Sequence, residues 1–159
     1  MELNDENAKK AYEAVIKALK DCQLYLEQDD ESLKVSLRSF YVGVDFSIDV
    51  KLNVEHCLVT FVSYIFDILP SDNLLEVVIA LNDVNSRLNN GRFYLLDKHI
   101  FFEISTRYNI EDTHLNYLKN INYMFKTTYN TIDDLGKSLI SLAKGTLTLP
   151  QFLIRHDAE

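Results

Sequence analysis

Glycine is scarce in this sequence: only four of the 159 residues are glycine, and no two of them lie within eight positions of each other. Loops that bind phosphate or pyrophosphate groups need clustered glycines, because the backbone must approach the ligand closely. The sequence therefore argues against both the mononucleotide-binding and the dinucleotide-binding loops. The glycines are Gly43, Gly91, Gly136 and Gly145.

Cysteine and long apolar runs are also in short supply. Cys22 and Cys57 are too few for a disulfide scaffold, and we expect both to be free thiols. The longest nearly apolar run, Leu58–Leu69, has 12 residues and contains Asp67, so it does not fit a transmembrane helix. The start of the chain is acidic and leads into no apolar stretch, unlike a secretory signal. These features predict a cytoplasmic protein with no membrane partner.

Motifs for catalysis, metals and cofactors are missing as well. The sequence has no His-Glu-x-x-His or paired Cys-x-x-Cys motif, no calcium loop and no Gly-x-Ser-x-Gly elbow. We therefore expect no metal, no cofactor and no catalytic residues, and predict that the protein is not an enzyme. An enzyme of unrecognised type stays open as an alternative, because the members of a triad need not be close in sequence.

The first half of the chain carries all of the net charge of −8. Residues 1–80 hold 15 acidic and 7 basic side chains, whereas residues 81–159 hold nine of each. Nucleic-acid-binding proteins concentrate lysine and arginine on one face, but here the basic residues of the second half are scattered singly. We therefore expect no nucleic-acid partner, although a local basic patch can still form in three dimensions.

Hydrophobic periodicity divides the first half of the chain into a helix and a set of strands. One apolar stripe at spacings of three and four predicts a helix over residues 5–28, which a charged turn at Gln28–Glu31 ends. From Ser32 the period changes to two, and the short connections indicate an antiparallel meander. Its three strands are predicted around residues 33–37, 42–52 and 56–66.

A second helix, a hairpin and a third helix are predicted in the second half. Poor helix formers at Thr127–Thr131 leave open a kink near Tyr129 in the third helix. The turn of the hairpin, Asp97-Lys98, contains no Asn-Gly or Asp-Gly pair, so its type is open. The predicted elements are a helix from about residue 72 to 89, strands at 92–96 and 99–104, and a helix from about 111 to 144.

These elements predict one α+β domain over residues 1–145 and a C-terminal tail over residues 146–159. Both the meander and the hairpin supply one apolar face, and the amphipathic helices need a common surface to cover. We therefore predict a single antiparallel sheet of about five strands, made of the three-strand meander and the hairpin. The helices are expected mainly on one face, in the order α-βββ-α-ββ-α.

The second helix is apolar over more of its surface than one sheet face needs. Leu75, Val78 and Ile79 lie beside the main stripe and have no obvious use within one chain. We identify them as a candidate self-association surface, because a two-fold contact would cover the same patch on both subunits. The competing prediction is that the long third helix, or the tail around Leu149 and Phe152, covers this edge. The main stripe consists of Leu74, Val77, Leu81, Val84 and Leu88.

A short motif joins the second helix to the hairpin. Leu81-Asn82-x-x-Asn85 is followed by Gly91-Arg92-Phe93-Tyr94-Leu95, which resembles the Leu-Asn helix end and Gly-Arg-Phe strand of the YbjN family. The order of elements over about residues 8–144 is similar too, and the fold of that family looks like that of type III secretion chaperones. The resemblance implies a small, acidic, cytosolic bacterial protein without catalytic residues, often a homodimer, that binds other proteins or acts as a regulator.

The leading hypothesis is thus a non-enzymatic protein-interaction module, chaperone-like or regulatory, that forms a homodimer and has a protein partner. The alternative is a small-ligand sensor domain, with an aromatic-lined pocket between the sheet and the long helix. An exposed apolar patch would favour the module, and a pocket lined by Phe and Tyr would favour the sensor. Titratable groups that converge in a cleft would favour the enzyme.

Overall fold

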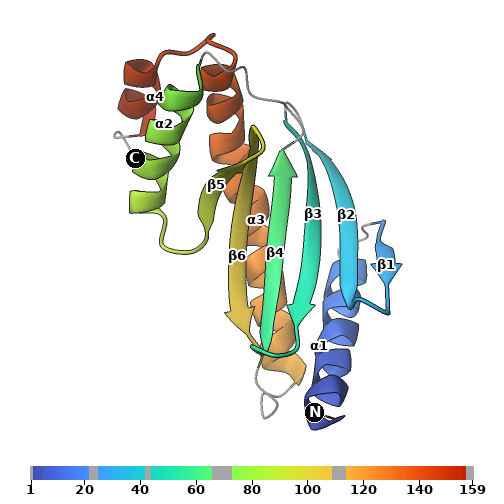
Figure 1. Ribbon diagram of the computed structural model, residues 1–159. Coiled ribbons are helices and arrows are strands. Elements are labelled where there is room, and N and C mark those ends of the chain that lie inside the picture. Colours follow the sequence, from blue (N-terminus) through green and yellow to red (C-terminus); the bar gives the residue numbers. More distant parts are fainter. Residues whose placement is uncertain (1, 22–24, 42–43, 66–72, 109–113, 157–159) are drawn as a thin grey trace.

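The structure, a computed structural model, describes residues 2–21, 25–41, 44–65, 73–108 and 114–156. They form four helices and six strands in the order α1-β1-β2-β3-β4-α2-β5-β6-α3-α4 (Figure 1). All six strands belong to one antiparallel sheet, in which they lie in the order β1-β2-β3-β4-β6-β5. The predicted α+β class and single antiparallel sheet are confirmed, with one short strand more than the five expected.

The meander occupies the middle of the sheet. Its strands are β2 (Lys34–Tyr41), β3 (Val44–Asn53) and β4 (Leu58–Ile65), and each pairs antiparallel with the next. On β3, Ile48 and Val50 are completely buried, whereas Asp49 between them lies on the opposite, partly exposed face. This alternation fixes the register, because a slip of one residue would turn the apolar set toward water.

The hairpin closes through a turn whose type the sequence pattern left open. β5 (Arg92–Leu96) pairs with β6 (His99–Arg107), and the last residue of β5 lies opposite the first of β6. The two connecting residues, Asp97 and Lys98, have positive φ angles of 48° and 65°. Two such residues in succession form a type I′ turn, whose twist matches that of the strands. β6 then pairs with β4, which joins the hairpin to the meander.

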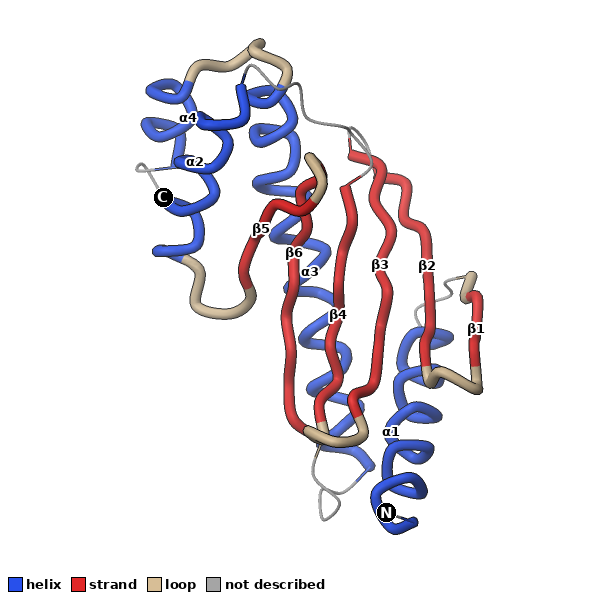
Figure 2. The backbone as a smooth tube through the Cα atoms, viewed as in Figure 1, coloured by secondary structure: helices blue, strands red, loops and turns tan. Residues whose placement is uncertain are grey.

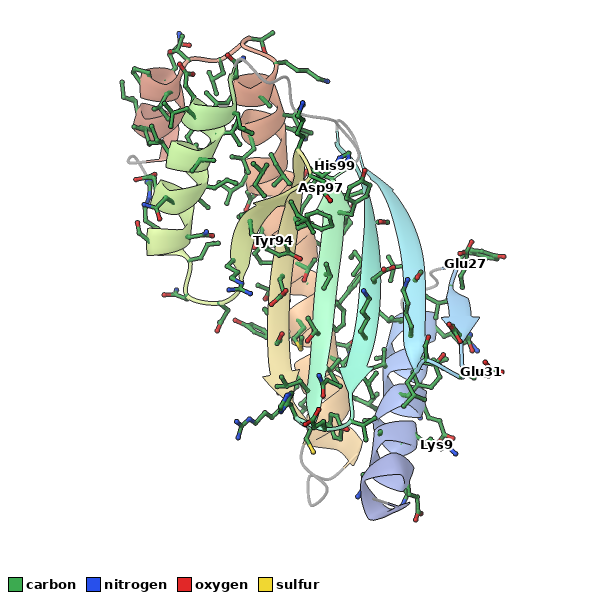
Figure 3. The ribbon with its side chains drawn as sticks, in the orientation of Figure 1. Lys9, Glu27, Glu31, Tyr94, Asp97 and His99 are labelled. Carbon is green, nitrogen blue, oxygen red and sulfur yellow. The ribbon has the colours of Figure 1, made fainter. Side chains whose placement is uncertain are left out.

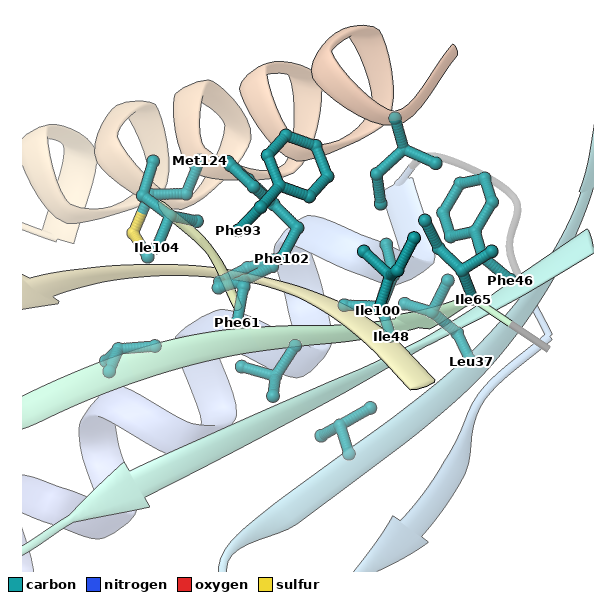
Figure 4. Packing of buried hydrophobic residues seen from close by; sticks show 14 of the residues in the cluster. Leu37, Phe46, Ile48, Phe61, Ile65, Phe93, Ile100, Phe102, Ile104 and Met124 are labelled. Atoms are coloured by element: carbon teal, nitrogen blue, oxygen red, sulfur yellow. The ribbon is translucent and has the colours of Figure 1, made fainter. Parts of the chain in front are cut away.

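Helices cover one face of the sheet. α1 (Glu2–Asp21) and α3 (His114–Ala143) lie side by side against this face, and the other face carries no helix in the described part of the chain (Figure 2). α2 (Leu74–Arg87) packs beside β5, and α4 (Leu149–His156) packs on α2 and α3. The core lies between the sheet and these helices, where Phe61, Phe102 and Met124 gather (Figure 4).

The first helix is shorter than predicted. α1 ends at Asp21. The sequence pattern predicted a helix end and a charged turn around Glu27–Asp29, but these residues form strand β1, which pairs with β2. All three residues of β1 are exposed, so the strand shows no apolar periodicity that could reveal it. A short, acidic outer strand also keeps this edge of the sheet from pairing with another chain.

The third helix is continuous. Residues 127–131 lie inside α3 without interruption, because the burial of Met124 and Ile132 on either side outweighs the poor helix propensity of the threonines. The expected helix start at residue 111 lies outside the described residues.

The segment predicted as a C-terminal tail contains a helix that the sequence pattern did not indicate. At the start of α4, the backbone N–H of Gln151 donates to Thr148 Oγ1 at 3.4 Å, and the backbone N–H of Thr148 donates to Gln151 Oε1 at 3.0 Å. This reciprocal pair is a capping box, which satisfies two backbone donors at the start of the helix. Phe152 is completely buried and anchors α4 to α2 and α3.

Burial of the main stripe of α2 gives a direct test of the fold. Leu81 is among the buried residues of this helix, so we expect Leu81→Asp to destabilise the protein by more than about 3 kcal/mol, because an unpaired carboxylate would enter the core. Thermal unfolding followed by circular dichroism measures this. Asn82→Asp, at the next and exposed position, is the control and should leave the melting temperature nearly unchanged. A Leu81→Asp protein that melts near the wild-type temperature would show that this stripe is not core.

A buried tyrosine ties α1 to the turn between β1 and β2. The Tyr12 hydroxyl lies 3.0 Å from Asp30 Oδ1 and 3.1 Å from the Lys34 carbonyl oxygen, and the side chain is buried. Burial, and then the hydrogen bond to Asp30, raise the pKa of Tyr12 to about 12. The folded state therefore favours the protonated phenol more than the unfolded state does.

This shift predicts an alkaline dependence of stability. The contribution of Tyr12 should be fully present below its unfolded pKa of about 10 and should be lost as the pH rises through about 12. The measurement is the free energy of unfolding, from urea titrations across this range, for the wild type and for Tyr12→Phe. The difference between the two proteins should be constant below pH 10 and shrink above it. A difference that does not change with pH would contradict the shift.

Candidate interaction surface

One side-chain amide fixes α2 to the edge of the sheet. Asn85 Nδ2 donates to the carbonyl oxygen of Phe93 at 2.7 Å, and the Phe93 N–H donates to Asn85 Oδ1, also at 2.7 Å. These backbone groups point away from β6, because in an antiparallel pair the residues alternate in the direction of their hydrogen bonds. The amide of Asn85 thus takes the place of a further strand. We call this pair of hydrogen bonds the Asn85 bridge.

Gly91, the glycine of the motif, allows the backbone between α2 and β5 to lie close to β6. Gly91 has a φ of +79°, and a Cβ there would lie 2.5 Å from Phe102 Cζ and 2.9 Å from the Glu103 carbonyl oxygen. No other residue fits without a shift of the backbone. The YbjN resemblance rests partly on Asn85 and Gly91. In this chain, these two residues hold α2 and the hairpin together.

The other end of α2 is attached to the end of α3. Asn73, which directly precedes α2, donates from Nδ2 to the carbonyl oxygens of Ala143, at 3.1 Å, and Leu142, at 3.5 Å. Carbonyl groups in the last turn of a helix have no partner within the helix, so this amide satisfies them. With one bridge near each end, α2 is held in a fixed orientation.

That orientation places the three predicted residues on the outside. The exposed fraction is 71% for Leu75, 45% for Val78 and 43% for Ile79. α4 packs on α2, as the competing prediction allowed, yet it leaves these side chains exposed. Ile154 of α4 is itself 69% exposed. We define Leu75, Val78 and Ile79 as the α2 patch, which the spacing i, i+3, i+4 places on one face of the helix.

Aromatic residues line the open face of the sheet near the hairpin turn, where Tyr94 and His99 lie (Figure 3). The rings of Tyr94 and Phe101 stack in parallel with centroids 5.2 Å apart, and Tyr64 adds a third ring 5.3 Å from Phe101. The Tyr64 hydroxyl lies 3.0 Å from His99 Nδ1. Partial burial, and then the carboxylate of Glu103, raise the pKa of Tyr94. The rings contact one another across neighbouring strands, which stabilises the sheet.

A pocket of about 210 Å³ lies between β6 and α3. Among the side chains around it, Tyr123 is the only aromatic one, and its hydroxyl accepts a hydrogen bond of 3.0 Å from Asn90 Nδ2. The pocket thus differs from the Phe- and Tyr-lined cavity of the sensor hypothesis. Its lining residues are Asn90, Ile104, Ser105, Thr106, Asn120, Tyr123 and Met124.

The described residues contain neither a metal-binding cluster nor a membrane-spanning helix. Within the described ranges, no three His, Cys, Asp or Glu side chains are grouped so that they could hold a metal ion. Across the same residues, no helix combines the length and the apolar character needed to cross a lipid bilayer. Cys57 is a free thiol, and Cys22 lies outside the described residues.

The fold and the α2 patch define an α+β protein with one open sheet face and an outward-facing apolar helix. No protein-family model matches the chain, and no curated protein matches it. In fold it is similar to a solved structure, that of YbjN from E. coli, which is described as "a putative transcription regulator". The identity is 10% and the TM-score 0.51, and the match covers 84% of this chain and 90% of that chain. This similarity shows the fold relation alone.

The Asn85 bridge is open to a direct test. We expect Asn85→Ala to lower the free energy of unfolding by about 2–4 kcal/mol, because it leaves a donor and an acceptor of Phe93 without partners. Urea denaturation measures this, with Asn82→Ala at an exposed position as the control. Equal stability of the two variants would mean that the bridge contributes little.

Proposed function

We propose that this chain is a non-enzymatic protein-interaction module, regulatory or chaperone-like, which acts in the cytoplasm and forms a homodimer through the α2 patch. The observation that carries the proposal is the exposure of three large apolar side chains on one face of a helix that is held at both ends. Contiguous exposed apolar residues are typical of surfaces that bind proteins. A two-fold contact would cover the patch on both subunits.

The size of the α2 patch predicts a weak dimer. Covering the exposed parts of Leu75, Val78 and Ile79 would contribute about 4 kcal/mol per subunit before the cost of association. Ile154 on the neighbouring α4 is available to enlarge the contact. A dimer of this strength exchanges with monomer, as a regulatory module that also takes other partners would need.

The small-ligand sensor has less support. The pocket between β6 and α3 is lined mainly by polar side chains, whereas sites for small molecules are mostly apolar with a few polar groups. The aromatic rings of the sheet lie on its open face and contact one another. These arrangements favour the interaction module.

Replacing the α2 patch should abolish the dimer without unfolding the protein. We expect Leu75→Lys with Ile79→Lys to be a folded monomer, because the two lysines would repel each other across the two-fold axis while the buried stripe stays intact. Multi-angle light scattering at micromolar concentrations measures the mass of the wild type and of the variant.

The matched control replaces two large exposed side chains elsewhere, Tyr25 and Leu96. Tyr25→Lys with Leu96→Lys adds the same charge and should leave the dimer intact. A wild type that is monomeric throughout, or a control that dissociates as readily as the α2 variant, would refute self-association through this patch.

A further inference from the structure

The edge of the sheet at β6 is only partly covered. β5 pairs with β6 as far as Arg92 and Glu103, whereas β6 continues to Arg107 (Figure 1). The stretch Ile104–Arg107 pairs with β4 on one side and, among the described residues, has no strand on the other. An uncovered strand edge presents backbone donors and acceptors that can pair with an extended chain.

The direction of these backbone groups follows from the pairing pattern. The N–H of Tyr108, the residue after β6, donates to the Cys57 carbonyl oxygen on the β4 side at 3.0 Å. Because the direction alternates along an antiparallel strand, the N–H and C=O groups of Ser105 and Arg107 point to the uncovered edge. Two residues on this edge are therefore oriented to form hydrogen bonds with an added strand.

The polar pocket lies at this same edge. Ile104, Ser105 and Thr106 of β6 form one side of it, and Asn120 and Tyr123 of α3 form the other, with Asn90 hydrogen-bonded to Tyr123. Ile104 and Met124 are buried below it. A strand added to β6 would place every second side chain over this pocket and the others on the open face, beside Arg92 and Arg107.

Basic residues outnumber acidic ones around this edge, although the whole chain has a net charge of −8. Arg107 is the only charged residue of β6 beyond Glu103, and Lys119 and Lys126 are the only charged ones among residues 118–127 of α3. All three are exposed. Arg92 is also exposed, and its Nη2 lies 3.3 Å from Oε1 of Glu103, the one acidic residue of β6. An acidic strand would complement this edge.

We propose that the edge of β6 at Ile104–Arg107 binds an acidic, extended peptide segment of a partner protein by strand addition. The peptide pairs its backbone with Ser105 and Arg107, sets small polar side chains over the pocket and places carboxylates beside Arg92 and Arg107. This inference rests on the proposed role in protein interaction, but it does not depend on the α2 patch.

The test measures the binding of a fluorescein-labelled peptide of alternating Glu and Thr residues by fluorescence anisotropy. Ser105→Pro removes the outward N–H at an edge position where proline is tolerated, and it should weaken binding about tenfold. Ser105→Ala keeps that N–H and loses only the hydroxyl, which contacts Thr60 Oγ1, so its binding should stay within about threefold of the wild type. Equal affinities of the Pro and Ala variants would overturn the proposal.

Charge is tested separately. Arg107→Glu should weaken binding of the Glu peptide about tenfold, whereas Lys17→Glu, an equal change at an exposed position of α1, should not. A peptide of alternating Lys and Thr should bind less tightly than the Glu peptide. If single-stranded DNA binds more tightly than the Glu peptide and is unaffected by Ser105→Pro, the edge is a site for phosphate backbones and the proposal is wrong.

Hydrogen exchange locates the contact. Addition of the Glu peptide should slow amide exchange at Ser105 and Arg107 while leaving the α2 patch unchanged. Peptide binding by the monomeric Leu75→Lys, Ile79→Lys variant would keep this proposal whether or not the wild type dimerises. A dimer that does not bind the peptide would overturn this proposal alone.

Discussion

The arrangement of this protein depends on the amide of Asn85, which ends the sheet where another strand would otherwise lie. By satisfying both backbone groups of Phe93, it allows a helix to cover this part of the edge of β5 without leaving those two groups unpaired. α2 is thereby fixed with its buried stripe inward, and the α2 patch necessarily faces out. Gly91 completes the connection, since the backbone between α2 and β5 passes too close to Phe102 for any side chain.

Much of the fold follows from periodicity in the sequence, and the exceptions have physical reasons. The alternation around Ile48 and the helical spacing of Leu75, Val78 and Ile79 predicted the meander and the α2 patch, because each pattern is local. β1 was missed because none of its residues is buried. The sequence did not reveal the role of Asn85, because its partners are the backbone N–H and C=O of Phe93, eight residues away on another element. An Asn near a helix end is also typical of a helix terminus.

Charge illustrates the same limit. The basic residues of the second half are spread along the sequence, yet the fold places Arg107 on β6 and Lys119 and Lys126 on α3, the strand and helix that line the polar pocket. β1, at the opposite edge of the sheet, is acidic (Figure 3). A net charge summed over the chain conceals this separation, and local potential rather than net charge decides which partner approaches which edge.

The pairing of β4 with β6 sets the order in which this chain can fold. The meander and the hairpin each join strands that are close in sequence, whereas Leu58 pairs with Arg107 and Tyr64 with Phe101, with the whole of α2 between them. Closing that loop costs chain entropy before the pairing returns any energy. We therefore expect the two local units to form before the central pairing. Until β6 pairs with it, the outer edge of β4 would face water, together with the Val59 and Phe61 side chains that are buried in the folded protein. A chaperone or a rapid docking of the hairpin would protect that intermediate from aggregation.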